Sequence, residues 1–191
     1  MIDKKAFATL RAQFEQFDAL REELIKQSRD VLKNSKAAIY STHRNDFKTA
    51  EAQLADARKM IKKLEVLIKK DVHLAQVGAW GEALEEYVES ACYYSFATKK
   101  KIPTAEELGV DADVYLPGVC DLVGELTRRA INAAVKEDYT TTFEIKEIVS
   151  EIFEELMLFD LRNIPARKKF DSIKYSLEKL EEVALNVKLK K

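Results

Sequence analysis

Residues 4–42 read KKAFATLRAQFEQFDALREELIKQSRDVLKNSKAAIYST, a stretch with neither glycine nor proline. Apolar residues recur along it at steps of three and four, at Phe7, Leu10, Phe14, Phe17, Leu20 and Leu24. One face of an α-helix repeats about every 3.6 residues, so this spacing predicts a single amphipathic helix over residues 4–42. So long a helix at the start of the chain favours an all-α fold.

Caps and breakers mark the remaining helices. Asp46 offers an N-cap for the second helix, and Pro103 stops the third, because the residue before a proline disfavours helical geometry. Two capping boxes pair Thr104 with Glu107 and Thr141 with Glu144. The later helices are expected from Asp46 through Ile68 and over about residues 71–98, 117–136, 141–159 and 165–189, with a short turn at 104–109 and a loop at 110–116.

The composition supports one helical domain over residues 1–191. The chain has only five glycines and three prolines, with 34% charged and 47% apolar residues, which excludes collagen-like, disordered and all-β classes. No strand pair with hairpin chemistry is found, so the predicted fold is all-α, an antiparallel bundle of six to seven helices. No apolar run is long enough for a membrane span, and no signal peptide is recognised, so we expect a cytoplasmic protein with no membrane contact. Cys92 and Cys120 are expected to be core residues.

The net charge of −1 hides two opposed charge fields. Residues 26–70 hold twelve Lys or Arg against five Asp or Glu, whereas residues 71–138 hold six against thirteen. The basic segment places cations and one aromatic ring on one helical face: Arg29, Lys33, Lys36, Tyr40, His43 and Arg44. Such a stripe matches the phosphates of a nucleic acid, although an ordinary solvated face has the same spacing.

The acidic segment carries a candidate metal site. Glu86 and Glu89 share one face of the third helix, and Asp121 and Glu125 share a face of the next. Four carboxylates in one place repel each other unless a cation neutralises them, and oxygen ligands select Mg²⁺ or Mn²⁺. A solvated acidic face is the alternative. A di-iron site is disfavoured, because neither histidine has a glutamate three residues before it.

Several motifs together resemble the translin family. The resemblance spans about residues 20–188 and rests on Ser28-Arg29-Asp30, Ser35-Lys36, Ile39, His43-Arg44, Glu86-Tyr87-Val88-Glu89, the stretch Tyr115–Arg128 with Asn132, and the run Arg167–Tyr175 with Lys179, Glu181, Glu182 and Val183. It implies about seven helices, a hollow octameric shell and RNA binding on the inner surface.

The resemblance also implies a catalytic role. In the branch of translin-associated factor X, the family has a Mg²⁺-dependent endoribonuclease site, whose acidic residues map onto Glu86, Glu89 and Asp121, with Glu125 beside them. Translin has no aspartate at the position of Asp121, so the chain resembles the catalytic branch. It lacks the long N-terminal extension of some relatives, which resembles a compact, self-assembling form.

These observations predict a homo-oligomeric endoribonuclease that uses Mg²⁺ or Mn²⁺. Its partners would be single-stranded or short duplex RNA, with single-stranded DNA as a further polyanion, and other copies of the chain. The apolar run around residues 153–159 suggests an interface, although it would serve equally in a monomer core. Two alternatives stay open: a nucleic-acid-binding shell without catalysis, and a purely structural bundle.

Overall fold

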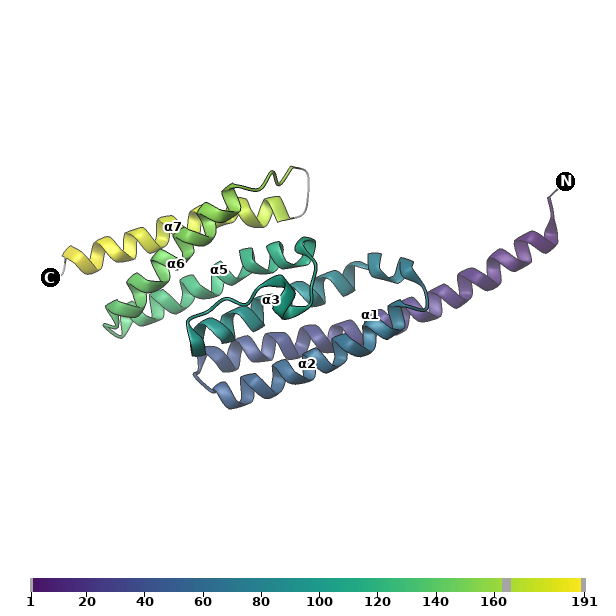
Figure 1. Ribbon diagram of the computed structural model, residues 1–191, viewed down its shortest axis with the longest axis horizontal. Coiled ribbons are helices and arrows are strands. Elements are labelled where there is room, and N and C mark those ends of the chain that lie inside the picture. The colour runs from purple at the N-terminus through teal and green to yellow at the C-terminus, as the bar shows by residue number, and fades with distance from the viewer. Residues whose placement is uncertain (1, 163–165, 190–191) are drawn as a thin grey trace.

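The computed structural model describes residues 2–162 and 166–189 of the chain, and every regular element in these ranges is a helix (Figure 1). The all-α prediction is therefore confirmed. The elements are α1 (Lys4–His43), α2 (Phe47–Ile68), the short 3₁₀ helix η1 (Val72–Gln76), α3 (Gly78–Lys99), α4 (Ala105–Leu108), α5 (Ala112–Val135), α6 (Tyr139–Met157) and α7 (Ala166–Leu189).

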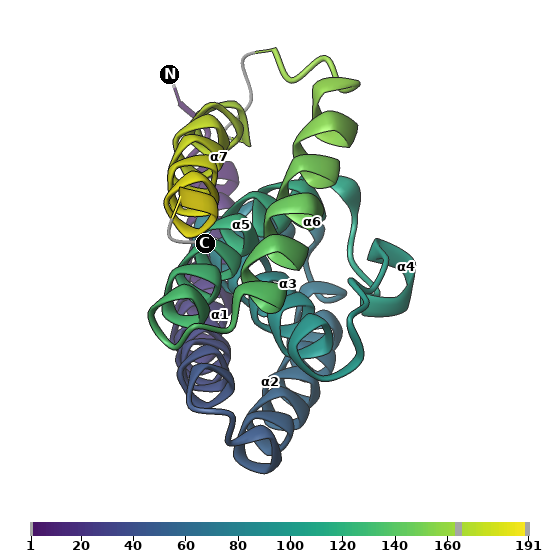
Figure 2. The ribbon, with the colours of Figure 1, turned by 90° about the vertical axis from the view of Figure 1, so that its left-hand side faces the viewer.

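The helices are stacked in layers with α3 in the middle. α1 and α2 lie side by side below α3, and α5 lies on its other side beneath α6 and α7 (Figures 1 and 2). α3 contributes to both apolar cores: Trp80 and Leu84 pack with α1 and α2, while Val88 and Phe96 pack with the later helices. Apolar residues around most of its circumference are typical of such a central helix.

The first turns of α1 project beyond the bundle as an arm (Figure 1). Phe7, Leu10 and Phe14 are 53%, 57% and 70% exposed, and full burial begins only at Leu24. The predicted amphipathic pattern is present, but the described residues leave the apolar side chains of its N-terminal part largely exposed.

The predicted loop at 110–116 is wrong, since α5 begins at Ala112 and holds Pro117 inside it. Proline removes one backbone donor from the helix. Packing offsets this loss, because Val114, Tyr115 and Leu116 all lie against the core. The Tyr115 hydroxyl also donates to the carbonyl of Pro103 at 2.9 Å.

Two other helix starts differ in detail from the prediction. Asp71 caps η1 by accepting from the backbone N–H of His73, and α3 begins seven residues later at Gly78. The predicted Thr141 capping box is wrong, since Asp138 is the N-cap and accepts from the Thr141 N–H at 3.1 Å. The predicted position of Pro165 in the last helix lies outside the described residues.

Two further predictions agree with the structure, those of one capping box and of the two cysteines. The Thr104–Glu107 capping box is present. Cys92 and Cys120 are buried and unpaired, as expected of core residues. None of the described helices combines the length and the hydropathy that a membrane span requires.

Candidate functional site

Four predicted carboxylates meet between α3 and α5. Glu86, Glu89 and Asp121 line one pocket of about 340 Å³. Glu86 and Glu89 also line a neighbouring pocket of about 240 Å³ with Glu125. We call these four residues the carboxylate cluster. Its members on α3 are at least 32 residues away in sequence from those on α5, and packing of α5 on α3 brings them together.

A glycine allows the two helices to approach this closely. A Cβ atom at Gly118 would lie 2.7 Å from the Val88 Cβ and 2.9 Å from the Glu85 carbonyl oxygen. Real Cβ atoms do not approach other atoms this closely, so a larger residue would push α5 away from α3. Gly118 lies one turn before Asp121 and thus sets the distance between the two halves of the carboxylate cluster.

Glu89 is the most buried member of the carboxylate cluster. Only 9% of it is exposed, and its carboxylate has no hydrogen bond or ion pair to any described residue. Burial raises its pKa to about 8, and the nearby charges of Glu86, Asp121 and Glu125 add to this effect. Burial also raises the pKa of Glu86, although the ammonium of Lys36 opposes that rise.

A lysine from α7 holds two acidic side chains. The Lys169 Nζ lies 2.5 Å from Asp121 Oδ2 and 2.6 Å from Glu85 Oε2. Sequence reasoning identified neither Lys169 nor Glu85 as a site residue, although Lys169 lies within the quoted Arg167–Tyr175 run. Its spacing gave no signal, because its partners are 48 and 84 residues away.

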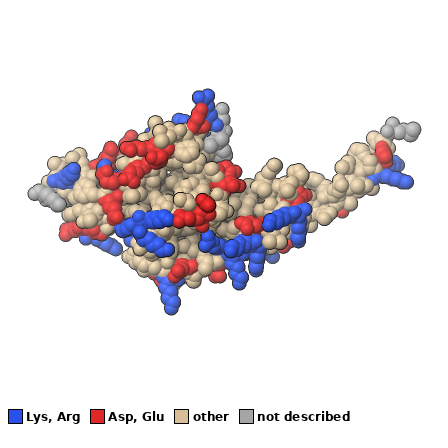
Figure 3. Space-filling model, viewed as in Figure 1, with Lys and Arg blue, Asp and Glu red and all other residues tan. Residues whose placement is uncertain are grey.

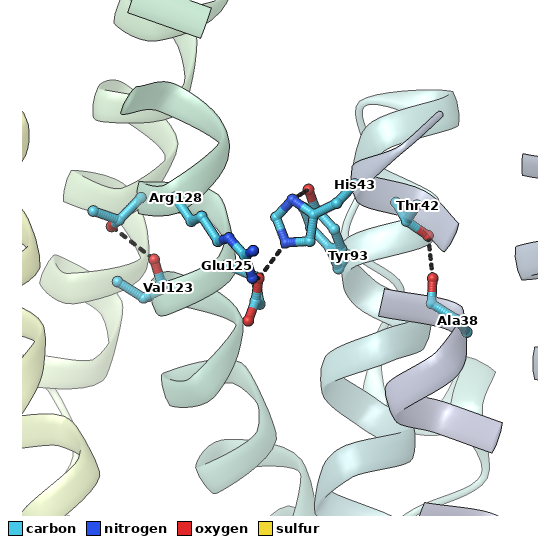
Figure 4. Close-up of polar contacts among 8 residues, drawn as sticks. Ala38, Thr42, His43, Tyr93, Val123, Glu125 and Arg128 are labelled. Atoms are coloured by element: carbon cyan, nitrogen blue, oxygen red, sulfur yellow. Dashed lines mark hydrogen bonds and ion pairs between the residues drawn. The ribbon is translucent and has the colours of Figure 1, made fainter. Parts of the chain in front are cut away.

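His43 points inward from the end of α1 and joins α3 to α5 (Figure 4). Its Nε2 contacts Glu125, and its Nδ1 lies 2.9 Å from the Tyr93 hydroxyl. The tautomer with a proton on Nε2 satisfies both contacts, since the Tyr93 O–H then donates to Nδ1. Arg128 Nη1 lies 3.9 Å from the same Glu125 oxygen. His43, predicted to face RNA, thus positions Glu125.

The other members of the basic stripe are exposed: Arg29, Lys33, Lys36, Tyr40 and Arg44. Lys36 and Tyr40 also line the smaller pocket beside the carboxylate cluster, and the Lys36 Nζ lies 3.8 Å from Glu86 Oε2. Basic side chains additionally gather over α2, and acidic ones over α6 (Figure 3). A phosphate chain that follows the basic stripe would therefore pass directly beside the carboxylates.

The donor atoms of the carboxylate cluster fit a hard divalent cation. All four side chains offer carboxylate oxygens, which suit Mg²⁺ and Mn²⁺. Cys120 lines the same pocket, but burial raises its pKa to about 12, so its thiol keeps its proton and is no thiolate ligand. Across the described residues, no three acidic, histidine or cysteine side chains are grouped closely enough to hold a metal ion. Asp121 and Glu125 instead face Lys169 and His43.

Comparisons with known proteins agree with this architecture. An uncharacterized protein of Methanocaldococcus jannaschii is 28% identical over 166 residues, which cover 85% of this chain and 73% of that protein. The rat translin-associated protein X is 26% identical, covering 88% of this chain and 72% of its own length. Chicken translin is 30% identical over 125 residues, which cover 58% of this chain and 55% of translin.

Solved structures show the same fold. The crystal structure of apo-NeC3PO superposes with a TM-score of 0.87 at 27% identity and covers 98% of both chains. AfC3PO in its complex with duplex RNA gives a TM-score of 0.83 at 23% identity, covering 97% of this chain and 98% of that one. The Translin family model matches residues 19–191, nearly the whole sequence. The chain therefore belongs to the Translin family.

Proposed function

We propose that this protein is a metal-dependent endoribonuclease that binds RNA inside a homo-oligomeric shell. The observation that carries the proposal is Glu89, a residue only 9% exposed that forms no ion pair with any described residue and lines a pocket with Glu86 and Asp121. Burial and neighbouring carboxylates keep Glu89 largely protonated near neutral pH, and a bound cation would favour its charged form. Ionisable groups perturbed in this way are typical of functional sites. Membership of a family that binds nucleic acids, and that includes RNases, gives the site its substrate class.

The chain's own residues would divide the work between holding the cation and holding the RNA. Glu86, Glu89 and Asp121 would hold Mg²⁺ or Mn²⁺, with Glu125 assisting from the orientation that His43 gives it. A divalent cation supplies Lewis-acid polarisation of a phosphate and makes a water more acidic. The cation would thereby assist hydrolysis of a phosphodiester bond.

The basic stripe would place the RNA backbone over this site. Lys36 and Tyr40 share a pocket with three of the carboxylates, so a phosphate on Lys36 lies beside the carboxylate cluster. Arg29, Lys33 and Arg44 would extend the contact along α1. Contacts to phosphates position a strand without reading its bases, so we expect little sequence preference. Single-stranded RNA, short duplex RNA and single-stranded DNA would all be bound.

Cleavage of labelled RNA tests the proposal. Purified protein should cut single-stranded or short duplex RNA with Mg²⁺ or Mn²⁺ and stop when EDTA is added. Asp121→Asn should abolish cutting and leave RNA affinity nearly unchanged, because Asp121 lies in the pocket without Lys36 or Tyr40. Asp113→Asn, an exposed change on the same helix, is the matched control. Full cutting by Asp121→Asn, free of contaminating ribonuclease, would refute the site.

A second candidate is a nucleic-acid-binding shell without catalysis. It is favoured by the ion pairs that occupy Asp121 and Glu125 and by the lack of a ready metal-binding group in the described ranges. RNA binding that persists while no divalent cation supports cutting would establish this function instead.

The oligomer would form through apolar surfaces that the single chain leaves uncovered. They are Phe7, Leu10 and Phe14 on the arm of α1, and Met157, Leu158 and Phe159 at the C-terminal end of α6, all at least half exposed. Exposed apolar patches of this kind usually mark interfaces. We propose a closed assembly of about eight copies in the cytoplasm, and light scattering coupled to size exclusion would measure its mass.

A further inference from the structure

Lys169 occupies a position between acidic side chains of two helices. It reaches from α7 to Asp121 on α5 and to Glu85 on α3, and its side chain is only 34% exposed. Charge-assisted contacts of 2.5 and 2.6 Å are short for N–H to oxygen hydrogen bonds. Ser172 and Ser176, one and two turns further along α7, line the pocket that also contains Asp121.

We infer that Lys169 acts as an internal counter-cation. Its ammonium competes with a divalent cation for Asp121 and thereby sets the concentration at which that cation binds. The inference rests on the proposed function, since it concerns the same carboxylate cluster. Lys169 is then a positioning residue: its removal raises the affinity for the cation, whereas removal of a ligand lowers it.

The charges around the site explain why such a counter-cation is needed. Five carboxylates lie in this region, because Glu85 joins the carboxylate cluster through Lys169. Like charges so close repel each other unless a cation lies among them. The ammonium supplies one positive charge on a side chain fixed to α7, so its local concentration is high without any free ion. In this form Asp121 is paired with Lys169.

Two partners allow Lys169 to release Asp121 without leaving the site. A divalent cation bound by Asp121 must replace the Nζ contact at 2.5 Å, whereas the contact to Glu85 lies outside the predicted ligand set. Glu85 would keep the displaced ammonium at the edge of the pocket. The free energy needed to break the Lys169–Asp121 ion pair therefore lowers the apparent affinity for the divalent cation.

Direct measurement of Mn²⁺ binding tests this inference without any assay of activity. Free Mn²⁺ is quantified by electron paramagnetic resonance during titration of the wild type, Lys169→Met and Lys169→Gln at fixed pH and salt. Loss of one positive charge within about 4–5 Å of the cation should tighten Mn²⁺ binding by about tenfold or more. Lys168→Met, an exposed neighbour on α7, is the control and should not change the affinity.

The direction of the change separates the possible outcomes. A purely structural role for Lys169 predicts weaker or unchanged Mn²⁺ binding in both variants, and that result would overturn the inference while the proposed function stands. If neither the wild type nor the variants bind Mn²⁺, the metal site itself is refuted, and the inference fails with it. Lys169→Gln keeps the test decisive if Lys169→Met does not fold, because the amide can still bond to Asp121 or Glu85.

Discussion

Replacement of Glu89 by glutamine should change how the stability of the protein depends on pH. Its pKa is about 8 in the folded protein against an ordinary value of 4.5, chiefly because burial disfavours the charged form. A group with a raised folded pKa binds more protons in the folded than in the unfolded state. Its contribution to stability is therefore present below pH 4.5 and is lost as the pH rises toward 8.

The size of the effect follows from the two pKa values. With a folded pKa of about 8 and an unfolded value of 4.5, ionisation of Glu89 costs about 1 kcal/mol of unfolding free energy at pH 5 and about 4–5 kcal/mol at pH 9. The wild type should thus lose about 4 kcal/mol across this range from Glu89 alone. Glutamine does not ionise, so Glu89→Gln should lack this loss.

Urea unfolding at pH 5, 7 and 9 in EDTA measures the effect. The protein concentration is held fixed, because the stability of an oligomer depends on it. The wild type and Glu89→Gln are compared by the change of unfolding free energy with pH rather than by its absolute value, since a buried amide has its own desolvation cost. Glu82→Gln on the exposed side of α3 is the control and should keep the wild-type slope. An equal slope in Glu89→Gln and the wild type would refute the burial argument.

Three further predictions concern the helix contact, the arm and the basic stripe. Gly118→Ala should lower the unfolding free energy by about 1–3 kcal/mol, because the new Cβ would lie 2.7 Å from the Val88 side chain. Chemical denaturation measures this loss, and an unchanged denaturation midpoint would contradict the close approach of the two helices. Phe14→Asp should reduce the assembly mass measured by light scattering with little loss of helical circular dichroism, since Phe14 is 70% exposed. Lys36→Met should weaken RNA binding and reduce by about one the slope of log affinity against log salt, and an unchanged slope would remove Lys36 from the interface.

The sequence predicts helix spans better than helix starts. The long first helix was predicted to within a residue or two, because an unbroken apolar stripe specifies it locally. The start of α5 was missed, since Pro117 and the residues before it favour a loop by local rules alone. The tertiary contacts of Val114, Tyr115 and Leu116 override that preference. The local sequence pattern does not predict these contacts.

Helical periodicity predicts which side chains share a face but not what that face meets. It placed Glu86 with Glu89, which line the same two pockets, and packing of α5 on α3 brings Asp121 into one of these pockets and Glu125 into the other. It also placed His43 with the basic stripe, yet His43 turns toward Glu125 because α1 packs on α3 at that point. Periodicity did not identify Lys169 for the same reason, since its contacts depend on how α7 packs against α5.

The arrangement around Glu89 is difficult to explain by stability alone. Ionisation of a buried carboxyl group with three others nearby costs free energy, which is why the pKa of Glu89 is raised, and an apolar residue of similar size would not carry that cost. Lys36 from α1 and Lys169 from α7 form ion pairs with Glu86 and Asp121, and among the described residues neither forms one with Glu89. The charge of Lys169 lowers the pKa of Glu89 only in part, since burial still raises it to about 8. An added divalent cation therefore gains most at Glu89, where the electrostatic cost of the fold is highest. Local conflicts of this kind are typical of functional sites.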